Sequence, residues 1–121
     1  MTETDNTKRY DLEDRTLKYT RAVIGFTDVI PKTIVNQEII KQLFRSSSSI
    51  GANYIEANGA LGKKDFIMRI RICRKETKES HYWLNLISTK DELLEKQKQS
   101  LINETIELLR IFNTILNNVK I

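Results

Sequence analysis

The chain has 121 residues, of which 40% are hydrophobic and 30% are charged. That length suits one domain that can bury a core without disulfides or a structural metal. The formal net charge of +4 is moderately basic, which is compatible with nucleic acid or an anionic surface but far from a histone-like tail. No apolar leader opens the chain and no apolar run approaches the roughly 18 residues that span a bilayer, so we expect a cytoplasmic protein without membrane contact.

The first helix is predicted from Asp11 or Leu12 to Ile30. Residues 1–10 are polar and lack a periodic pattern, so we expect them to form a disordered N-terminal tail. After them, apolar and small residues recur every three or four positions, as on the buried face of a helix. They are Leu12, Thr16, Tyr19, Val23, Phe26 and Ile30. Pro31 should end the helix, because the residue before a proline disfavours helical backbone.

A second helix is predicted to begin at Asn36, a suitable N-cap residue, and to end near Gly59 to Gly62. Its run of four serines, 46–49, would in other settings indicate a loop. Apolar residues continue in helical phase across this run and no proline interrupts it, so we expect the serines to be helical. Their small side chains would let a neighbouring helix approach closely. The inward positions are expected to be Ile40, Leu43, Ser47, Ile50, Tyr54 and Ala57.

The third predicted helix runs from Lys63 to about Thr89 and carries a buried stripe with alternating four- and three-residue spacings. The stripe consists of Phe66, Ile70, Cys73, Thr77, Ser80, Leu84 and Ile87. Cys73, the only cysteine of the chain, is therefore interpreted as a small buried hydrophobe in a reducing compartment.

The same helix is strongly basic between Lys63 and Lys78, where only Asp65 and Glu76 are acidic. The basic residues are Lys63, Lys64, Arg69, Arg71, Arg74, Lys75 and Lys78. A helix that is buried on one side and cationic on the other can present charge to a polyanion such as nucleic acid. A solvated face, neutralised by acidic residues elsewhere, is the alternative.

A fourth helix is predicted from roughly Gln99 to Val119, after a polar connection rich in lysine and glutamine. Its stripe comprises Leu101 or Ile102, Thr105, Leu108, Phe112, Ile115 and Val119. Strand signals are nearly absent from the chain. Four helices joined by short loops predict an all-α fold, an antiparallel up-down-up-down four-helix bundle formed by residues 11–121.

Two strips of polar residues on the central helices raise the question of a catalytic or metal site. The set is Arg45, Ser49, Asn53 and Glu56 on the second helix, with Glu76 and Glu79 on the third. A bundle-core metal site would need Glu-x-x-His pairs, and the chain has one histidine, His81. We therefore interpret these residues as a structural polar network in which arginine neutralises glutamate, with no metal, cofactor or catalytic group.

The central helices also resemble a known bacterial family. The resemblance lies in RSSSSIGANYIEA at residues 45–57, KKDF at 63–66 and CRKETKESHYWL at 73–84, and it extends over all but about the first ten residues. These segments are similar to those of the 23S rRNA intervening-sequence proteins, also called S23 ribosomal proteins. The relatives of that family include the accessory variability protein of diversity-generating retroelements. The resemblance implies a cytoplasmic, non-enzymatic four-helix bundle that assembles as a homopentameric ring and binds nucleic acid through basic surface.

The charge pattern and the family resemblance are compatible with two functions, nucleic-acid binding and protein interaction. The first is a ring-forming, non-enzymatic protein that binds structured RNA or duplex nucleic acid through phosphate contacts with low sequence specificity. The alternative is a protein-interaction scaffold whose partner is a reverse transcriptase or a ribosomal component. Unpaired outward side chains at Arg71, Lys75 and Lys78 would favour the first, and pairing of each with an acid would favour the second. Tyr82 and Trp83 could stack on bases, although Trp83 falls on an apolar strip.

Overall fold

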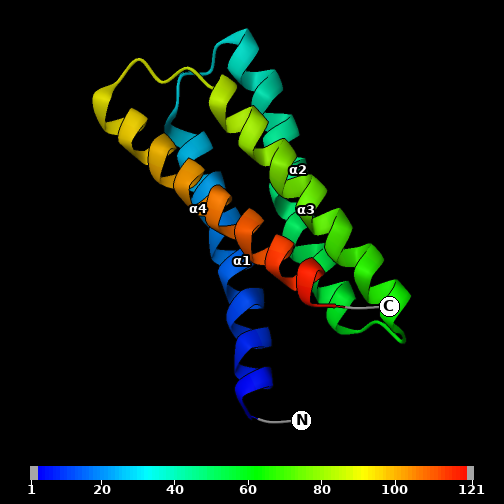
Figure 1. Cartoon of the computed structure of the whole chain (residues 1–121). Coiled ribbons are helices and arrows are strands. Elements are labelled where there is room, and N and C mark those ends of the chain that lie inside the picture. Colours follow the sequence, from blue (N-terminus) through cyan, green and yellow to red (C-terminus); the bar gives the residue numbers. More distant parts are fainter. Residues whose placement is uncertain (1–2, 120–121) are drawn as a thin grey trace.

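The computed structural model describes the backbone of residues 3–119 and the side chains of residues 11–119. It contains four helices and no strand among these residues (Figure 1). The helices are α1 (Glu3–Val29), α2 (Ile34–Asn58), α3 (Lys63–Leu86) and α4 (Glu92–Asn118). Short connections reverse the chain between consecutive helices, which confirms the predicted all-α, up-down-up-down four-helix bundle.

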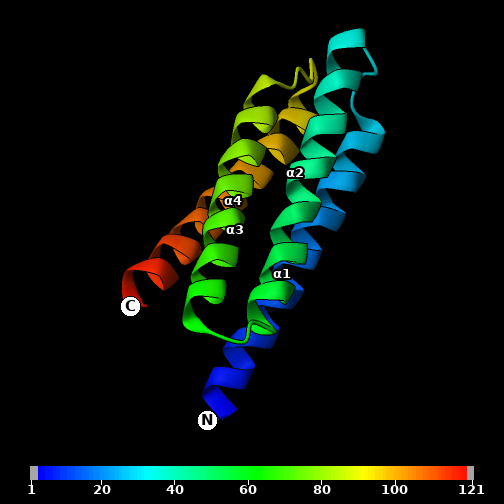
Figure 2. The ribbon, with the colours of Figure 1, turned by 90° about the vertical axis from the view of Figure 1, so that its right-hand side faces the viewer.

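The four helices do not contact one another equally. In both ribbon views α2 and α3 run side by side, and this pair makes the most extensive contact in the bundle (Figure 2). The contact between α1 and α4 is the smallest, and α4 crosses α1 at an angle in Figure 1. The pair α2 and α3, which carries most of the polar residues singled out in the sequence, is therefore the most closely joined part of the fold.

The predicted start of the first helix is wrong, because the helical backbone begins at Glu3 rather than at Asp11 or Leu12. Residues before Asp11 are polar, so apolar periodicity gave no signal there, whereas helical backbone needs only the absence of breakers such as proline. Residues 1–2 of the predicted tail lie outside the described residues, and the division into a tail and a bundle domain stays a prediction.

The buried stripes of the helices agree closely with the periodic pattern. All six stripe positions expected on α1 are buried, and Ile70, Cys73, Thr77 and Ser80 are fully buried on α3. The serine run is helical, as expected, and two of its members, Ser46 and Ser47, are fully buried. Phe66 and Ile40 are only partly buried against the core, and Ile39 takes the buried position expected of Ile40.

The start of α2 differs from the prediction. Thr33, not Asn36, is the N-cap, and the Thr33 hydroxyl accepts a hydrogen bond of 3.0 Å from the Asn36 backbone N–H. The Asn36 side chain is buried and donates to the carbonyl oxygens of Pro31 and Ser88, both at 2.9 Å. Asn36 thus joins the α1–α2 loop to the α3–α4 loop, a role that a side-chain amide suits as well as capping.

The start of α4 was also predicted too late. Asp91 is the N-cap, and its carboxylate accepts hydrogen bonds from the backbone N–H groups of Leu93 and Leu94. The expected lysine- and glutamine-rich connection is the first part of this helix, and it is polar because that part is exposed. A cap followed by acidic residues in the first turn is a recognised helix start, and it identifies this one better than apolar periodicity does. The preceding helix ends at Leu86, slightly before the expected Thr89.

Candidate nucleic-acid interface

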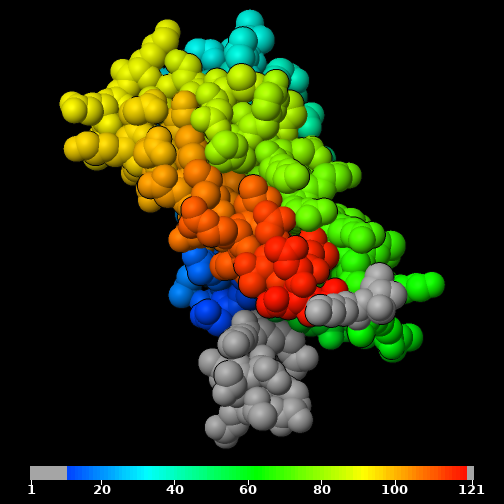
Figure 3. Space-filling view, viewed as in Figure 1, coloured from blue at the N-terminus to red at the C-terminus, as the bar shows by residue number. Residues whose placement is uncertain are grey.

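Four of the seven predicted nucleic-acid-binding residues form one exposed line along α3, here called the cationic stripe. It consists of Lys64, Arg71, Lys75 and Lys78, and all four residues are exposed. Spacings of seven, four and three residues place them on one face of the helix. Among the residues whose side chains are described, none of the four makes a hydrogen bond or an ion pair. Helix α3 lies at the molecular surface along much of its length in Figure 3.

The other three predicted residues do not join this line. Arg69 donates a hydrogen bond of 3.1 Å to the side-chain oxygen of Asn53 on α2. Arg74 donates one of 3.3 Å to the side-chain oxygen of Asn113 on α4. Lys63 is exposed at the first position of α3, off the line of the stripe. Arg69 and Arg74 therefore connect helices within the bundle.

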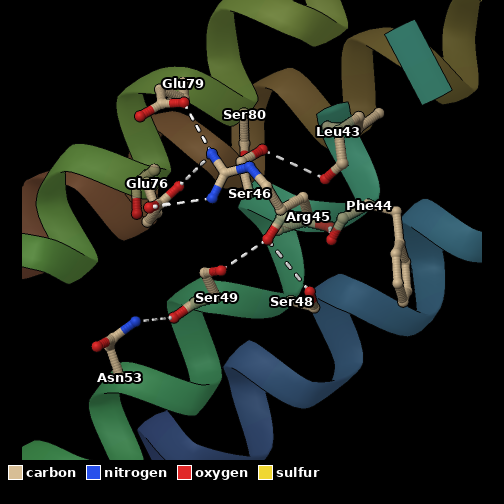
Figure 4. A network of polar contacts seen from close by, with 12 residues as sticks. Leu43, Phe44, Arg45, Ser46, Ser48, Ser49, Asn53, Glu76, Glu79 and Ser80 are labelled. Atoms are coloured by element: carbon tan, nitrogen blue, oxygen red, sulfur yellow. Dashed lines mark hydrogen bonds and ion pairs between the residues drawn. The ribbon is translucent and has the colours of Figure 1, made fainter. Parts of the chain in front are cut away.

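The glutamates of α3 do not neutralise the cationic stripe, because both of them pair with an arginine of α2. Arg45 on α2 lies between the two carboxylates in Figure 4 and pairs with Glu76 at 3.0 Å and Glu79 at 2.9 Å. The remaining acid of α3 is Asp65, in the first turn, where negative charge favours the helix N-terminus. Glu76 and Glu79, the glutamates close to Lys75 and Lys78 in sequence, are thus paired with a residue of α2 and not with the stripe.

Burial explains why Arg45 is needed. The Glu76 side chain is only 7% exposed, whereas the Arg45 side chain is 49% exposed. A buried carboxylate without a partner is costly, and a guanidinium that reaches it from the rim neutralises the charge while remaining partly hydrated. The hydrogen bond to Glu76 is the main cause that raises the pKa of Arg45 above its ordinary value, and the charge of Glu79 adds to it.

Further polar contacts extend the network along the α2–α3 boundary. The Ser49 hydroxyl donates to the Arg45 backbone oxygen at 2.7 Å, and the Asn53 amide donates to the Ser49 backbone oxygen at 2.9 Å. Ser46 and Ser80 share a buried hydrogen bond of 2.8 Å, which requires the close helix approach expected of the serine run.

Glu56 is the one member of the predicted polar network that the structure leaves apart. Its side chain is exposed and makes no hydrogen bond or ion pair within the described residues. Conversely, the polar network between α2 and α3 includes three residues that the sequence did not indicate as members, namely Arg69, Ser46 and Ser80. Helical phase was the available signal for Arg69, because it lies seven residues before Glu76 and so on the same side of α3.

A second group of charged residues lies on the surface between α1 and α4. A shallow depression there is lined by several charged residues, among them Asp14, Arg15, Lys18 and Glu104. Their charges are already paired, since Arg15 binds Glu104 in a bidentate pair of 2.7 and 2.9 Å and Lys18 contacts Asp14 at 2.9 Å. The described residues contain no group of three or more potential metal ligands, and no described helix is apolar over a length that would cross a membrane.

Comparison with known proteins agrees with the resemblance seen in the central helices. The family model for the 23S rRNA-intervening sequence protein matches residues 8–114. A solved structure from Bacteroides thetaiotaomicron VPI-5482, described as a protein with unknown function from the S23 ribosomal protein family, is 30% identical in sequence. The similarity covers 92% of this chain and 99% of that chain, with a TM-score of 0.75. No curated protein matches the chain significantly. The chain therefore belongs to the 23S rRNA-intervening sequence protein family.

Proposed function

We propose that this protein is a non-enzymatic nucleic-acid-binding bundle that contacts phosphates through the cationic stripe, with little dependence on base sequence. The observation that carries the proposal is that Lys64, Arg71, Lys75 and Lys78 are exposed and unpaired among the described residues, while both glutamates of α3 are paired with Arg45. A solvated face neutralised by neighbouring acids would show the opposite arrangement.

The dimensions of the stripe suit a nucleic-acid backbone. From Lys64 to Lys78 the helix rises about 20 Å, at about 1.5 Å per residue. Each strand of a duplex carries one phosphate for about every 3.4 Å of helix axis, so a length of about 20 Å offers enough phosphates for four cations. Lysine and arginine contacts of this kind position a protein on nucleic acid without reading bases, which accounts for the low sequence specificity.

Self-association into a ring is the second part of the proposal. Several large apolar side chains remain exposed on the outer side of α1 and α2, namely Leu17, Ile24, Phe44 and Ile55. Exposed apolar residues that form one patch can mark a protein-protein contact, and a second copy of the chain is the partner that the family resemblance implies. A closed ring would repeat the cationic stripe, and linked weak contacts bind tightly through effective concentration.

A charge-reversal experiment tests this function. The double variant Arg71→Glu/Lys75→Glu should lose at least tenfold in affinity for a structured rRNA fragment and for a DNA duplex, because two phosphate contacts become repulsive. Its matched control is Arg21→Glu/Lys96→Glu, which changes the net charge equally at exposed residues of α1 and α4 that make no ion pair among the described residues. Equal loss in both variants would refute the cationic stripe as the contact surface, and no binding by a folded wild type would favour the protein-scaffold alternative.

A further inference from the structure

The cationic stripe continues into an exposed aromatic residue. Tyr82 follows Lys78 by four residues, so it extends the line of the stripe by one further turn of α3. Its side chain is among the more exposed apolar groups of the described surface, with 59% of the residue accessible. The sequence suggests Tyr82 and Trp83 together as stacking residues, but in the structure only Tyr82 is exposed and Trp83 is partly buried.

Trp83 serves as a support for the Tyr82 ring. It is partly buried against the hydrophobic core, and its ring meets that of Tyr82 edge to face, with centroids 5.1 Å apart and planes at 74°. This is a favourable geometry for an aromatic pair, worth about 0.5–1.5 kcal/mol, so it favours this position of the Tyr82 ring. Within the described part of the chain the Tyr82 hydroxyl makes no hydrogen bond, so packing rather than polar contact orients the ring.

The position of Tyr82 beside Lys78 suits one nucleotide contacted at two points. One helical turn is a rise of about 5.4 Å, so a phosphate at Lys78 leaves the neighbouring base within reach of the Tyr82 ring. Aromatic side chains bind the π-face of any base, and interleaved cations and aromatics are the usual means of holding single strands without sequence preference. The bases of an intact duplex are stacked on one another and do not offer that face.

We propose that Tyr82 is a stacking platform for an unpaired base, so that the preferred ligand is nucleic acid with a single-stranded segment next to the phosphates on the stripe. This inference rests on the proposed function, because Tyr82 acts together with Lys78 and Arg71. The stacking platform would select nucleic acid with unpaired bases. The charges alone do not make this selection, because cations bind duplex and single-stranded phosphates alike.

The test compares two ligands, a single-stranded uridine oligomer and a blunt DNA duplex of equal length, both fluorescently labelled. Tyr82→Ala should weaken binding of the oligomer by roughly five- to 150-fold, the range found when stacking aromatics are replaced by alanine, and leave the duplex unchanged. Tyr82→Phe should bind both ligands as the wild type does, because the ring and not the hydroxyl makes the contact. Met68→Ala, which removes exposed apolar surface beside the stripe without removing a ring, is the matched control.

A second readout comes from Trp83, the only tryptophan of the chain. The oligomer should change Trp83 emission in the wild type and in Tyr82→Phe, because the stacked base lies next to the aromatic pair. If Tyr82→Ala binds the oligomer as tightly as the wild type while Arg71→Glu/Lys75→Glu loses both ligands, stacking is refuted and phosphate binding stands. If the folded wild type binds neither ligand, the proposed function fails and stacking fails with it.

Discussion

Two faces of α3 carry charged residues within the same turns. The charges on one face are paired with a neighbouring helix, and those on the other face are unpaired among the described residues. On the side toward α2, Glu76 and Glu79 are paired with Arg45. On the outer side, Arg71, Lys75 and Lys78 are exposed and unpaired among the described residues. The number of charges on a helix therefore says little about function, whereas the face that each charge occupies separates structural charges from those available to a ligand.

Removal of Arg45 should break the structural face. Arg45→Ala leaves the buried Glu76 carboxylate without its partner, and we expect the free energy of unfolding to fall by about 2 kcal/mol. Loss of one member of a buried pair costs about 3–5 kcal/mol, and the figure is lower here because Arg45 is half-exposed and partly screened by solvent. Urea unfolding measures the change.

The control for that variant lies on the outer face. Arg71→Ala should alter the free energy of unfolding by less than about 0.5 kcal/mol, as is usual for a surface residue without partners. Equal destabilisation by Arg45→Ala and Arg71→Ala would mean that both faces of α3 are structural.

High pH should destabilise the core without involving either charged face. Burial raises the pKa of Tyr19 from 10.0 to about 12 and that of Cys73 from 9.0 to about 12. Both groups are neutral when protonated and lose their protons first in the unfolded chain, so stability is intact below about pH 9 and falls as pH rises toward 12. Tyr19 alone should contribute about 2 kcal/mol to this loss.

Thermal unfolding between pH 8 and pH 11 measures the effect, with Tyr19→Phe as the comparison. This variant removes the titrating hydroxyl together with its 2.6 Å hydrogen bond to Thr105, so it should be less stable at pH 8 and less sensitive to alkali. A wild-type melting temperature that stays constant up to pH 11 would contradict the buried environment of both groups.

Substitution of Trp83, on the side of α3 that faces α2, by phenylalanine should have a smaller effect on the free energy of unfolding. Its indole N–H is buried and has no hydrogen-bond partner among the described residues. Trp83→Phe removes that unpaired donor along with some apolar area, so the two effects should nearly cancel and the free energy of unfolding should change by less than about 1 kcal/mol. Trp83→Ala, the control for lost packing, should cost about 3 kcal/mol. A phenylalanine variant as unstable as the alanine variant would show that the N–H is paired in the folded protein.

The sequence predicted the fold well where a residue's role depends on periodic burial. The stripes of α1 and α3 and the helical serines followed from apolar phase, because each helix must bury one face. The starts of α1 and α4 were missed because the sequence shows no apolar phase there, and most residues in the first turn of α4 are exposed. Asn36 was misassigned because an asparagine caps a helix or joins two loops equally well, and only the neighbouring Ser88 decides between these roles.

The candidate interface was predictable in part. Spacings of seven, four and three residues in the sequence place Lys64, Arg71, Lys75 and Lys78 on one helical face, and all four are exposed in the structure. Spacing does not predict the partner of each charged side chain, because the partner depends on how α2 and α4 pack against α3. Arg69 and Arg74 therefore looked like their exposed neighbours in sequence, although each contacts an asparagine on another helix.

The dependence of nucleic-acid affinity on salt concentration tests whether the cationic stripe binds phosphates. For the wild type, the logarithm of the affinity for a DNA duplex should fall linearly with the logarithm of salt concentration, with a slope near −0.9 for each phosphate contacted. Arg71→Glu/Lys75→Glu should reduce the magnitude of that slope by about two for each bound protomer, and Arg21→Glu/Lys96→Glu should leave it unchanged. A wild-type slope near zero, or one that the stripe variant does not alter, would contradict phosphate recognition by the outer face of α3.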